Sequence, residues 1–161
     1  MVNLQQLTRD VCSIAKEIGC YLRNERLEFT ISDVEEKNSN DYVSYVDKTA
    51  EHKLVKLLSD LLPEAGFIAE EGTATYSGED FCWIIDPLDG TTNYIHDEAP
   101  YGVSIALKQQ EEVLVGVVYE VCRDECFYAW KGGGAYMNNS SIHVSKLQTL
   151  QNAFLVTELP Y

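Results

Sequence analysis

The sequence is poor in basic residues. Its 161 residues include 12 Lys and Arg against 26 Asp and Glu, which gives a formal net charge of −14 at pH 7. Such an excess of negative charge opposes surface-wide attraction to nucleic acid or to an anionic membrane. We therefore expect cations and small molecules as partners, with no nucleic acid and no membrane. An anionic substrate then requires divalent metal ions that invert the local field.

The chain also lacks the patterns of disulfides, leader peptides and membrane spans. Its five cysteines are an odd number, and none of them forms a Cys-x-x-Cys motif. The N-terminus has no basic region followed by an apolar run, and no apolar stretch approaches the length that crosses a membrane. These absences favour a reduced, cytoplasmic protein.

The length fits one domain, residues 1–161, and the first part of it reads as helical. Apolar residues at three-and-four spacing from Leu4 to Leu22 predict an amphipathic helix. A second helix is predicted to open near Asp47, with an acidic first turn, and to stop at Pro63. Between them, residues 35–41 are polar and aperiodic, which predicts a mobile loop.

Beyond residue 66 the pattern changes to short β-type runs. They are residues 67–69, 81–85, 103–107, 113–119 and 125–130, and later runs end at Val144 and Thr157. Short gaps between neighbouring runs favour hairpins, so we expect an α+β fold in which two helices pack on a largely antiparallel sheet. Residues 132–134 are three glycines without a following Lys-Ser/Thr pair, so a hairpin turn is preferred there to a phosphate-binding loop.

One turn combines the features of a metal and phosphate site. A buried strand, residues 83–86, ends in the carboxylate of Asp86, and Pro87 prevents the ladder from continuing normally. Asp86 and Asp89 flank the turn and offer oxygen ligands of the kind that Mg²⁺ prefers, Gly90 allows close backbone approach, and residues 91–93 are helix N-cap types. Because Asp-Pro-x-x-Gly is also ordinary turn chemistry, this segment alone leaves a plain β-turn equally open.

Two further acidic elements bear on that choice. Glu70 and Glu71 follow the apolar run 67–69 directly, so a second strand end could present a carboxylate beside the first. Taken alone, this pair reads better as a solvated loop, and Asp47 reads better as a partner of the helix dipole. Two acid clusters at strand ends nevertheless favour a metal site over a plain turn.

The segment Asp86-Pro87-Leu88-Asp89-Gly90-Thr91-Thr92-Asn93-Tyr94 resembles the signature of the inositol monophosphatase family. The resemblance extends over essentially the whole chain, in family order, through residues 43–47, 67–71, 100–106 and 155–161. It implies the first half of a layered α/β sugar-phosphatase fold, the N-terminal metal-binding half of such an enzyme.

The resemblance also implies roles for individual residues. Glu70, Asp86 and Asp89 match carboxylate ligands of two or three Mg²⁺ ions, and the carbonyl of Leu88 matches a further ligand. Leu88, Asp89, Gly90 and Thr91 match the substrate-binding segment, with Gly90 and Thr91 on the phosphate. Asp47 and Thr91 match the acid and hydroxyl that orient and deprotonate a metal-activated water for in-line attack on phosphorus. Inhibition by Li⁺ and a homodimer are implied in the same way.

The sequence departs from the family at its end. Family members continue past the point matched by Pro160 and Tyr161 into a second half, where a Trp-Asp motif completes one metal site. We therefore expect the C-terminal half to be absent and the isolated chain to be feeble or inactive, since Mg²⁺ binds poorly when carboxylates are missing.

Three functional hypotheses remain open at this point. The first is Mg²⁺-dependent hydrolysis of a phosphate monoester, either inositol monophosphate or a related sugar or polyol phosphate. The second is a nucleotide 3′-phosphatase or fructose-bisphosphatase of the same superfamily. The third is a non-catalytic metal-binding or protein-interaction module on a truncated scaffold.

Overall fold

The computed structural model describes residues 2–29, 34–38 and 41–156, and it begins with a long amphipathic helix. This helix, α1 (Leu4–Arg26), opens at Asn3, whose side chain accepts a hydrogen bond from the backbone N–H of Gln6 at 3.1 Å. Its buried apolar side chains recur every three or four residues: Leu7, Val11, Ala15, Ile18 and Leu22. The predicted helix is confirmed, and it continues four residues beyond Leu22.

The second helix, α2 (Tyr45–Leu61), begins two residues before the predicted start. Ser44 caps it: the Ser44 hydroxyl accepts from Val46 N–H at 3.1 Å, and the Asp47 carboxylate accepts from Ser44 N–H at 2.8 Å. This capping box satisfies N–H groups that have no partner inside a helix. Pro63 stands two residues after the last helical residue, as predicted.

The strands from β3 onward form one seven-stranded sheet. Its order is β3-β4-β5-β6-β7-β8-β9, with β3 parallel to β4 and every other neighbouring pair antiparallel. The strands are β3 (Gly66–Ala69), β4 (Phe81–Asp89), β5 (Gly102–Gln109), β6 (Glu112–Glu120), β7 (Glu125–Trp130), β8 (Gly134–Met137) and β9 (Ser140–Ile142). The predicted α+β fold is confirmed, since the sheet is antiparallel apart from its first pair.

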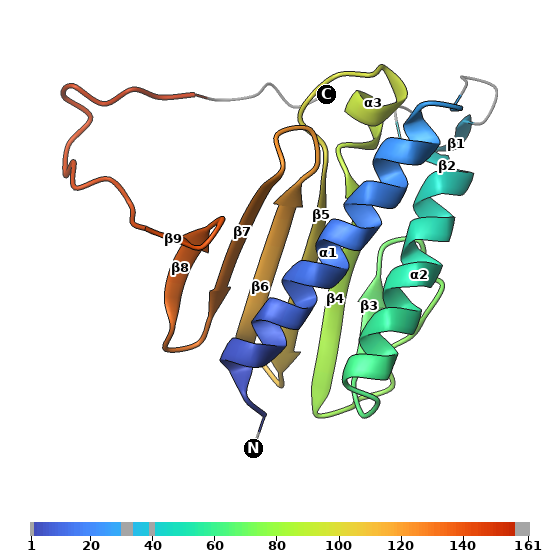
Figure 1. Ribbon diagram of the computed structural model, residues 1–161, viewed down its shortest axis with the longest axis horizontal. Coiled ribbons are helices and arrows are strands. Elements are labelled where there is room, and N and C mark those ends of the chain that lie inside the picture. The colour runs from blue at the N-terminus through green and yellow to red at the C-terminus, as the bar shows by residue number, and fades with distance from the viewer. Residues whose placement is uncertain (1, 30–33, 39–40, 157–161) are drawn as a thin grey trace.

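Both long helices lie side by side across one face of this sheet, α1 over β5 to β7 and α2 over β4 (Figure 1). The core fills the space between the helices and the sheet, and its sheet side is built from alternate residues of the central strands. Trp83 and its register partner Leu107 are fully buried on that side, while Ile84, the next residue of β4, is 37% exposed. Among the described residues, no helix is long and apolar enough to cross a membrane.

The opposite face of the sheet carries small and aliphatic residues without a covering layer in the described chain. Register aligns one row across seven strands, running through Ile68, Ile84, Ala106, Gly116, Ala129, Ala135 and Ile142. Ile68 is 44% exposed and Val118, in the next row, is 46% exposed. After β9, residues 143–156 form neither helix nor strand and run away from the sheet (Figure 1).

Two sequence predictions are corrected by the backbone. Residues 35–41 are not simply a loop, because β1 (Val34–Asn38) and β2 (Asp41–Ser44) pair as a separate antiparallel two-stranded sheet. Polarity reports exposure of side chains, whereas the ladder is made by backbone groups that every residue carries. The later β-type runs also differ: β9 ends at Ile142 rather than Val144, residues 143–156 form no strand, and Thr157 lies outside the described residues.

The predicted hairpin turn at the three glycines is confirmed. Gly133 N–H donates to the carbonyl of Trp130 at 2.9 Å, and the chain reverses from β7 into β8. Gly132 and Gly134 have φ angles of 78° and 83°, a backbone region that glycine enters without steric cost.

Candidate active site

The parallel pairing of β3 with β4 sets two carboxyl groups at the same edge of the sheet. Ala69 is in register with Ile85, so the residues that follow, Glu70 just beyond β3 and Asp86 within β4, lie side by side. Carboxyl ends of parallel strands meet at one edge, whereas antiparallel pairing would have sent them to opposite edges. The two acidic segments singled out in the sequence are therefore brought together.

Asp86 is in an environment that disfavours its negative charge. Its pKa is raised from 3.8 to about 8, first by burial, then by a hydrogen bond with the Glu70 carboxyl group and repulsion from Glu70, and less by repulsion from Asp89. The backbone N–H of Leu88 opposes this by donating to Asp86 Oδ1 at 3.0 Å. Glu70 and Asp89 thus both repel the charge of Asp86, and a cation beside Asp86 would relieve that repulsion.

The turn that carries these groups is a distortion of β4. The strand register shifts between Asp86 and Asp89, and the chain then enters the short helix α3 (Thr91–Ile95) through Gly90. Gly90 has a φ of 92°, and a Cβ atom there would lie 3.0 Å from the carbonyl oxygen of Pro100. The predicted helix start is correct but its cap is not: Gly90 occupies the N-cap position, and no side chain caps α3.

Asp47 and Thr91, far apart in the sequence, are in contact. Asp47 is 2% exposed, and its Oδ2 accepts from the Ser44 N–H at 2.8 Å and from the Ser44 hydroxyl at 2.6 Å. Its Oδ1 lies 3.2 Å from Thr91 Oγ1, which is also 3.0 Å from the carbonyl oxygen of Leu88. A hydroxyl has one proton, so Thr91 donates to one of these acceptors at a time.

Sequence reasoning missed a second buried carboxylate on α2. Glu51 is fully buried, and its two oxygens accept from the backbone N–H groups of Glu71 at 2.6 Å and Thr73 at 2.8 Å. A signal existed, because Asp47, Glu51 and Leu54 follow the spacing of one helix face. An acidic residue within an apolar stripe is almost never fully buried without partners.

The donor atoms in this region suit a hard cation. They are carboxylate oxygens of Glu70, Asp86 and Asp89 with the carbonyl of Leu88, and the Leu88 oxygen keeps a second lone pair beside its bond with Thr91. Within residues 2–29, 34–38 and 41–156, no group of three or more His, Cys, Asp or Glu side chains is gathered as a metal-binding cluster. Mg²⁺ is usually held by one or two carboxylates with water and phosphate oxygens, so the pair Glu70 and Asp86 fits it.

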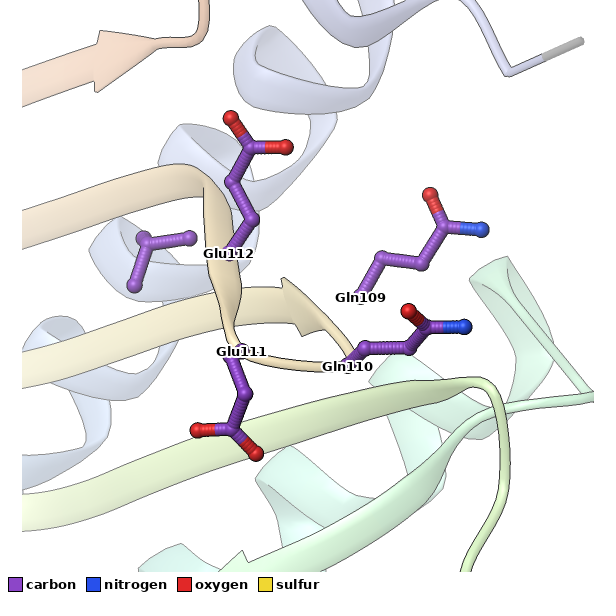
Figure 2. A pocket seen from close by; sticks show the side chains of 5 residues that line it. Gln109, Gln110, Glu111 and Glu112 are labelled. Atoms are coloured by element: carbon purple, nitrogen blue, oxygen red, sulfur yellow. The ribbon is translucent and has the colours of Figure 1, made fainter.

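A separate hollow of about 610 Å³ lies at the other end of the sheet, around the β5–β6 hairpin. β5 starts at Gly102, opposite Asp89, and ends at Gln109, so the hollow is a strand length away from the acidic turn. The side chains of Gln109 and Gln110 point one way and that of Glu111 another (Figure 2). These groups do not converge, and the acidic turn remains the better candidate site.

Comparison with known proteins gives a family match over nearly the whole chain. The model of the inositol monophosphatase family matches residues 3–161. A fructose-1,6-bisphosphatase/inositol-1-monophosphatase of Aquifex aeolicus is 40% identical over 99% of this chain and 61% of its own length. An inositol monophosphatase of Dictyostelium discoideum is 35% identical over 99% and 60%, and a Nus factor SuhB of Vibrio cholerae is 42% identical over 78% and 48%.

Solved structures share the fold. The extragenic suppressor protein suhB of Bartonella henselae is 34% identical, with a TM-score of 0.80 over 86% of this chain and 54% of that one. An IMPase/NADP phosphatase complexed with Mg²⁺ and phosphate is 27% identical, with a TM-score of 0.76 over 87% and 53%. A Staphylococcal inositol monophosphatase-1, a LiCl-soaked inhibitory complex, is 26% identical, with a TM-score of 0.77 over 88% and 54%. The chain spans about three fifths of the first two curated relatives and about half of these structures.

Proposed function

The chain belongs to the inositol monophosphatase family, and from that membership we propose that it supplies the metal- and phosphate-binding part of a Mg²⁺-dependent phosphomonoesterase. The observation that carries the proposal is the meeting of Asp86 with Glu70 and Asp89, beside the contact between Asp47 and Thr91. Ligands for a metal ion and a side chain that can orient the attacking water are two elements by which enzymes hydrolyse phosphate esters.

The acidic edge is the proposed metal site. Glu70, Asp86 and Asp89 hold the ions through carboxylate oxygens, and Leu88 adds its carbonyl oxygen. When bound, Mg²⁺ lowers the pKa of the attacking water and offsets charge on the phosphoryl oxygens. The pKa of Asp86, raised by burial and by its acidic neighbours, supports a cation there, because positive charge is what this cluster of carboxyl groups lacks.

The proposed water-orienting pair is Asp47 with Thr91. Because Asp47 Oδ2 is occupied by Ser44, its Oδ1 is the oxygen directed at the Thr91 hydroxyl. When the Thr91 hydroxyl donates its hydrogen bond to Asp47, the Thr91 oxygen can accept a hydrogen bond from a water molecule. That water is then oriented for attack, and its proton passes toward Asp47. Thr91 is not the nucleophile in this scheme.

The proposed phosphate contacts are made by the segment Leu88 to Thr91. Gly90 brings the backbone close to the ligand because it has no side chain and its φ of 92° directs the chain around the turn. The proposed substrate is inositol monophosphate or a related sugar or polyol phosphate. The same proposal includes inhibition by Li⁺ and assembly as a homodimer. It also treats residues 1–161 as a single domain that a C-terminal half completes.

The test is Mg²⁺-dependent release of phosphate from inositol 1-phosphate, with fructose 1,6-bisphosphate and a nucleoside 3′-phosphate as competing substrates. We expect Asp86→Asn to lower the rate by at least about 100-fold, the size of effect seen when a charge-stabilising group is removed. Asp60→Asn, an exposed change on α2 that alters net charge equally, is the matched control. Turnover that survives chelation of Mg²⁺, or equal rates in the two variants, contradicts the proposed site.

A non-catalytic module is the second candidate. It is favoured by the name of the Vibrio cholerae relative, a Nus factor. The uncovered sheet face with exposed Ile68 and Val118 is a further reason to consider protein interaction. Absence of turnover on all three substrates even when the C-terminal half is supplied, together with intact folding and Mg²⁺ binding, favours this reading over the enzyme.

A further inference from the structure

The buried carboxylate of Glu51 has a distinct relation to the candidate site. Its oxygens bind separate backbone amides, Oε2 the N–H of Glu71 at 2.6 Å and Oε1 the N–H of Thr73 at 2.8 Å. Those amides belong to the turn that begins at Ala69, where Gly72 N–H donates to the Ala69 carbonyl at 3.2 Å. Glu51 therefore clamps the turn that follows β3 from the helix side.

The peptide that Glu51 holds is the one that links Glu70 to Glu71. Fixing the N–H of this peptide fixes the orientation of the backbone on the C-terminal side of Glu70, and hence the direction from which the Glu70 side chain leaves the chain. On its other side, Glu70 is fixed by the parallel pairing of β3 with β4. The contact between the Glu70 and Asp86 carboxyl groups thus depends on an anchor at each end of Glu70.

Asp47 and Glu51 make equivalent connections from one face of α2. They are four residues apart, so their side chains leave the helix one above the other. Asp47 reaches the turn after β4 through Thr91, at 3.2 Å, and Glu51 reaches the turn after β3. A single helix face is therefore linked to both acidic segments and sets their relative position.

A charged carboxylate at this place is explained by the two amides. Burying a carboxylate is costly unless hydrogen bonds compensate it, and in the described part of the chain no ion pair involves Glu51. Glutamine would have nearly the same shape but only one acceptor oxygen, so its NH₂ group would face the second backbone N–H. Glutamate has two acceptor oxygens and can therefore accept from both backbone N–H groups.

We infer that Glu51 is a positioning residue for the metal site, holding Glu70 toward Asp86 through the backbone of the turn between them. This inference rests on the proposed function, because it assumes that Glu70 is a metal ligand. Glu51 itself touches neither metal nor substrate in this scheme. Its contribution is therefore expected in metal affinity, where partners behind the ligands commonly account for about 10- to 100-fold.

The experiment measures Mg²⁺ binding by amide NMR titration of the chain and of four variants. We expect Glu51→Gln to raise the Mg²⁺ dissociation constant by about tenfold or more. The control Glu17→Gln, an exposed change on α1, is expected to leave it unchanged. A Glu51→Gln/Glu70→Gln double variant is expected to bind no more weakly than Glu70→Gln alone, because Glu51 acts through Glu70.

Each outcome separates the two proposals. If the unmodified chain shows no Mg²⁺ binding, both the proposed function and the role of Glu51 are overturned. Suppose instead that the unmodified chain binds Mg²⁺. Only the role of Glu51 is then overturned if Glu51→Gln has the same Mg²⁺ dissociation constant as Glu17→Gln, or if the double variant shows additive losses of Mg²⁺ affinity. Should Glu51→Gln fail to fold, hydrogen exchange of the unmodified chain decides: coupling is reciprocal, so Mg²⁺ must slow exchange at the amides of Glu71 and Thr73. Unchanged exchange there overturns the inference.

Discussion

Replacing Thr91 by valine tests the contact between α2 and the acidic turn without requiring activity. Valine keeps the shape of threonine and removes only the hydroxyl, which lies 3.2 Å from Asp47 Oδ1 and 3.0 Å from the Leu88 carbonyl oxygen. Since one proton serves both acceptors, one hydrogen bond is lost, worth about 1.5–3 kcal/mol when the acceptor is charged and about 0.5–1.5 kcal/mol when it is neutral. We expect the free energy of unfolding to fall by about 2 kcal/mol, which for a chain of this size lowers Tm by about 4–8 °C.

The assay is urea unfolding followed by circular dichroism, with Thr92→Val as the matched control. Thr92 is the neighbouring threonine of α3, and its side chain makes no hydrogen bond within the described residues. A double-variant cycle with Asp47→Asn isolates the part of the loss that belongs to the Asp47 contact. An equal or smaller loss of unfolding free energy for Thr91→Val than for Thr92→Val would contradict a stabilising role of the Thr91 hydroxyl.

Two further changes probe the turn and its aromatic support. Gly90→Ala is expected to cost about 1–2 kcal/mol in urea unfolding, because alanine is strained at a φ of 92°; its Cβ would also press on the Pro100 carbonyl, so the loss should exceed that of Gly72→Ala, where φ is 73° and the space is open. Burial is the main cause that raises the pKa of Tyr101 from 10.0 to about 12, so the folded state holds this proton more tightly than the unfolded state. That stabilisation is complete below pH 10 and is lost as pH rises toward 12. The free energy of unfolding should therefore fall less steeply across this pH range for Tyr101→Phe than for the unmodified chain. Parallel profiles for the two proteins would contradict a raised pKa at Tyr101.

The elements that sequence predicted well are those defined by local periodicity. The stripe from Leu4 to Leu22 specified α1, and the acidic first turn with Pro63 specified α2, because helix faces and stops are written within a few residues. A disturbance of the strand at Asp86-Pro87 was also foreseen, but it is a register shift inside β4, which continues to Asp89, and not the predicted end of the strand. These features depend on neighbours in sequence, so no knowledge of the rest of the fold was needed.

What could not be predicted depends on contacts between distant segments. The parallel pairing of β3 with β4 is an exception in an antiparallel sheet, yet this pairing brings Glu70 to Asp86. The spacing of Glu51 with Asp47 and Leu54 could have predicted its burial, but not its partners, because these are backbone amides 20 and 22 positions away that carry no sequence signal. The pairing of β1 with β2 was missed for a similar reason, since backbone ladders form under polar side chains as well.

The four-residue spacing on α2 also decides where the chain tolerates insertion. One residue added between Asp47 and Glu51 turns the second side chain by about 100° around the helix and removes it from the amides it binds. The stretch from Ala74 to Asp80 is different, because the clamped amides precede it and longer loops cost little extra entropy. Length variation among relatives is therefore expected to accumulate in that loop, while the number of residues between Asp47 and Glu51 on α2 is expected to stay the same.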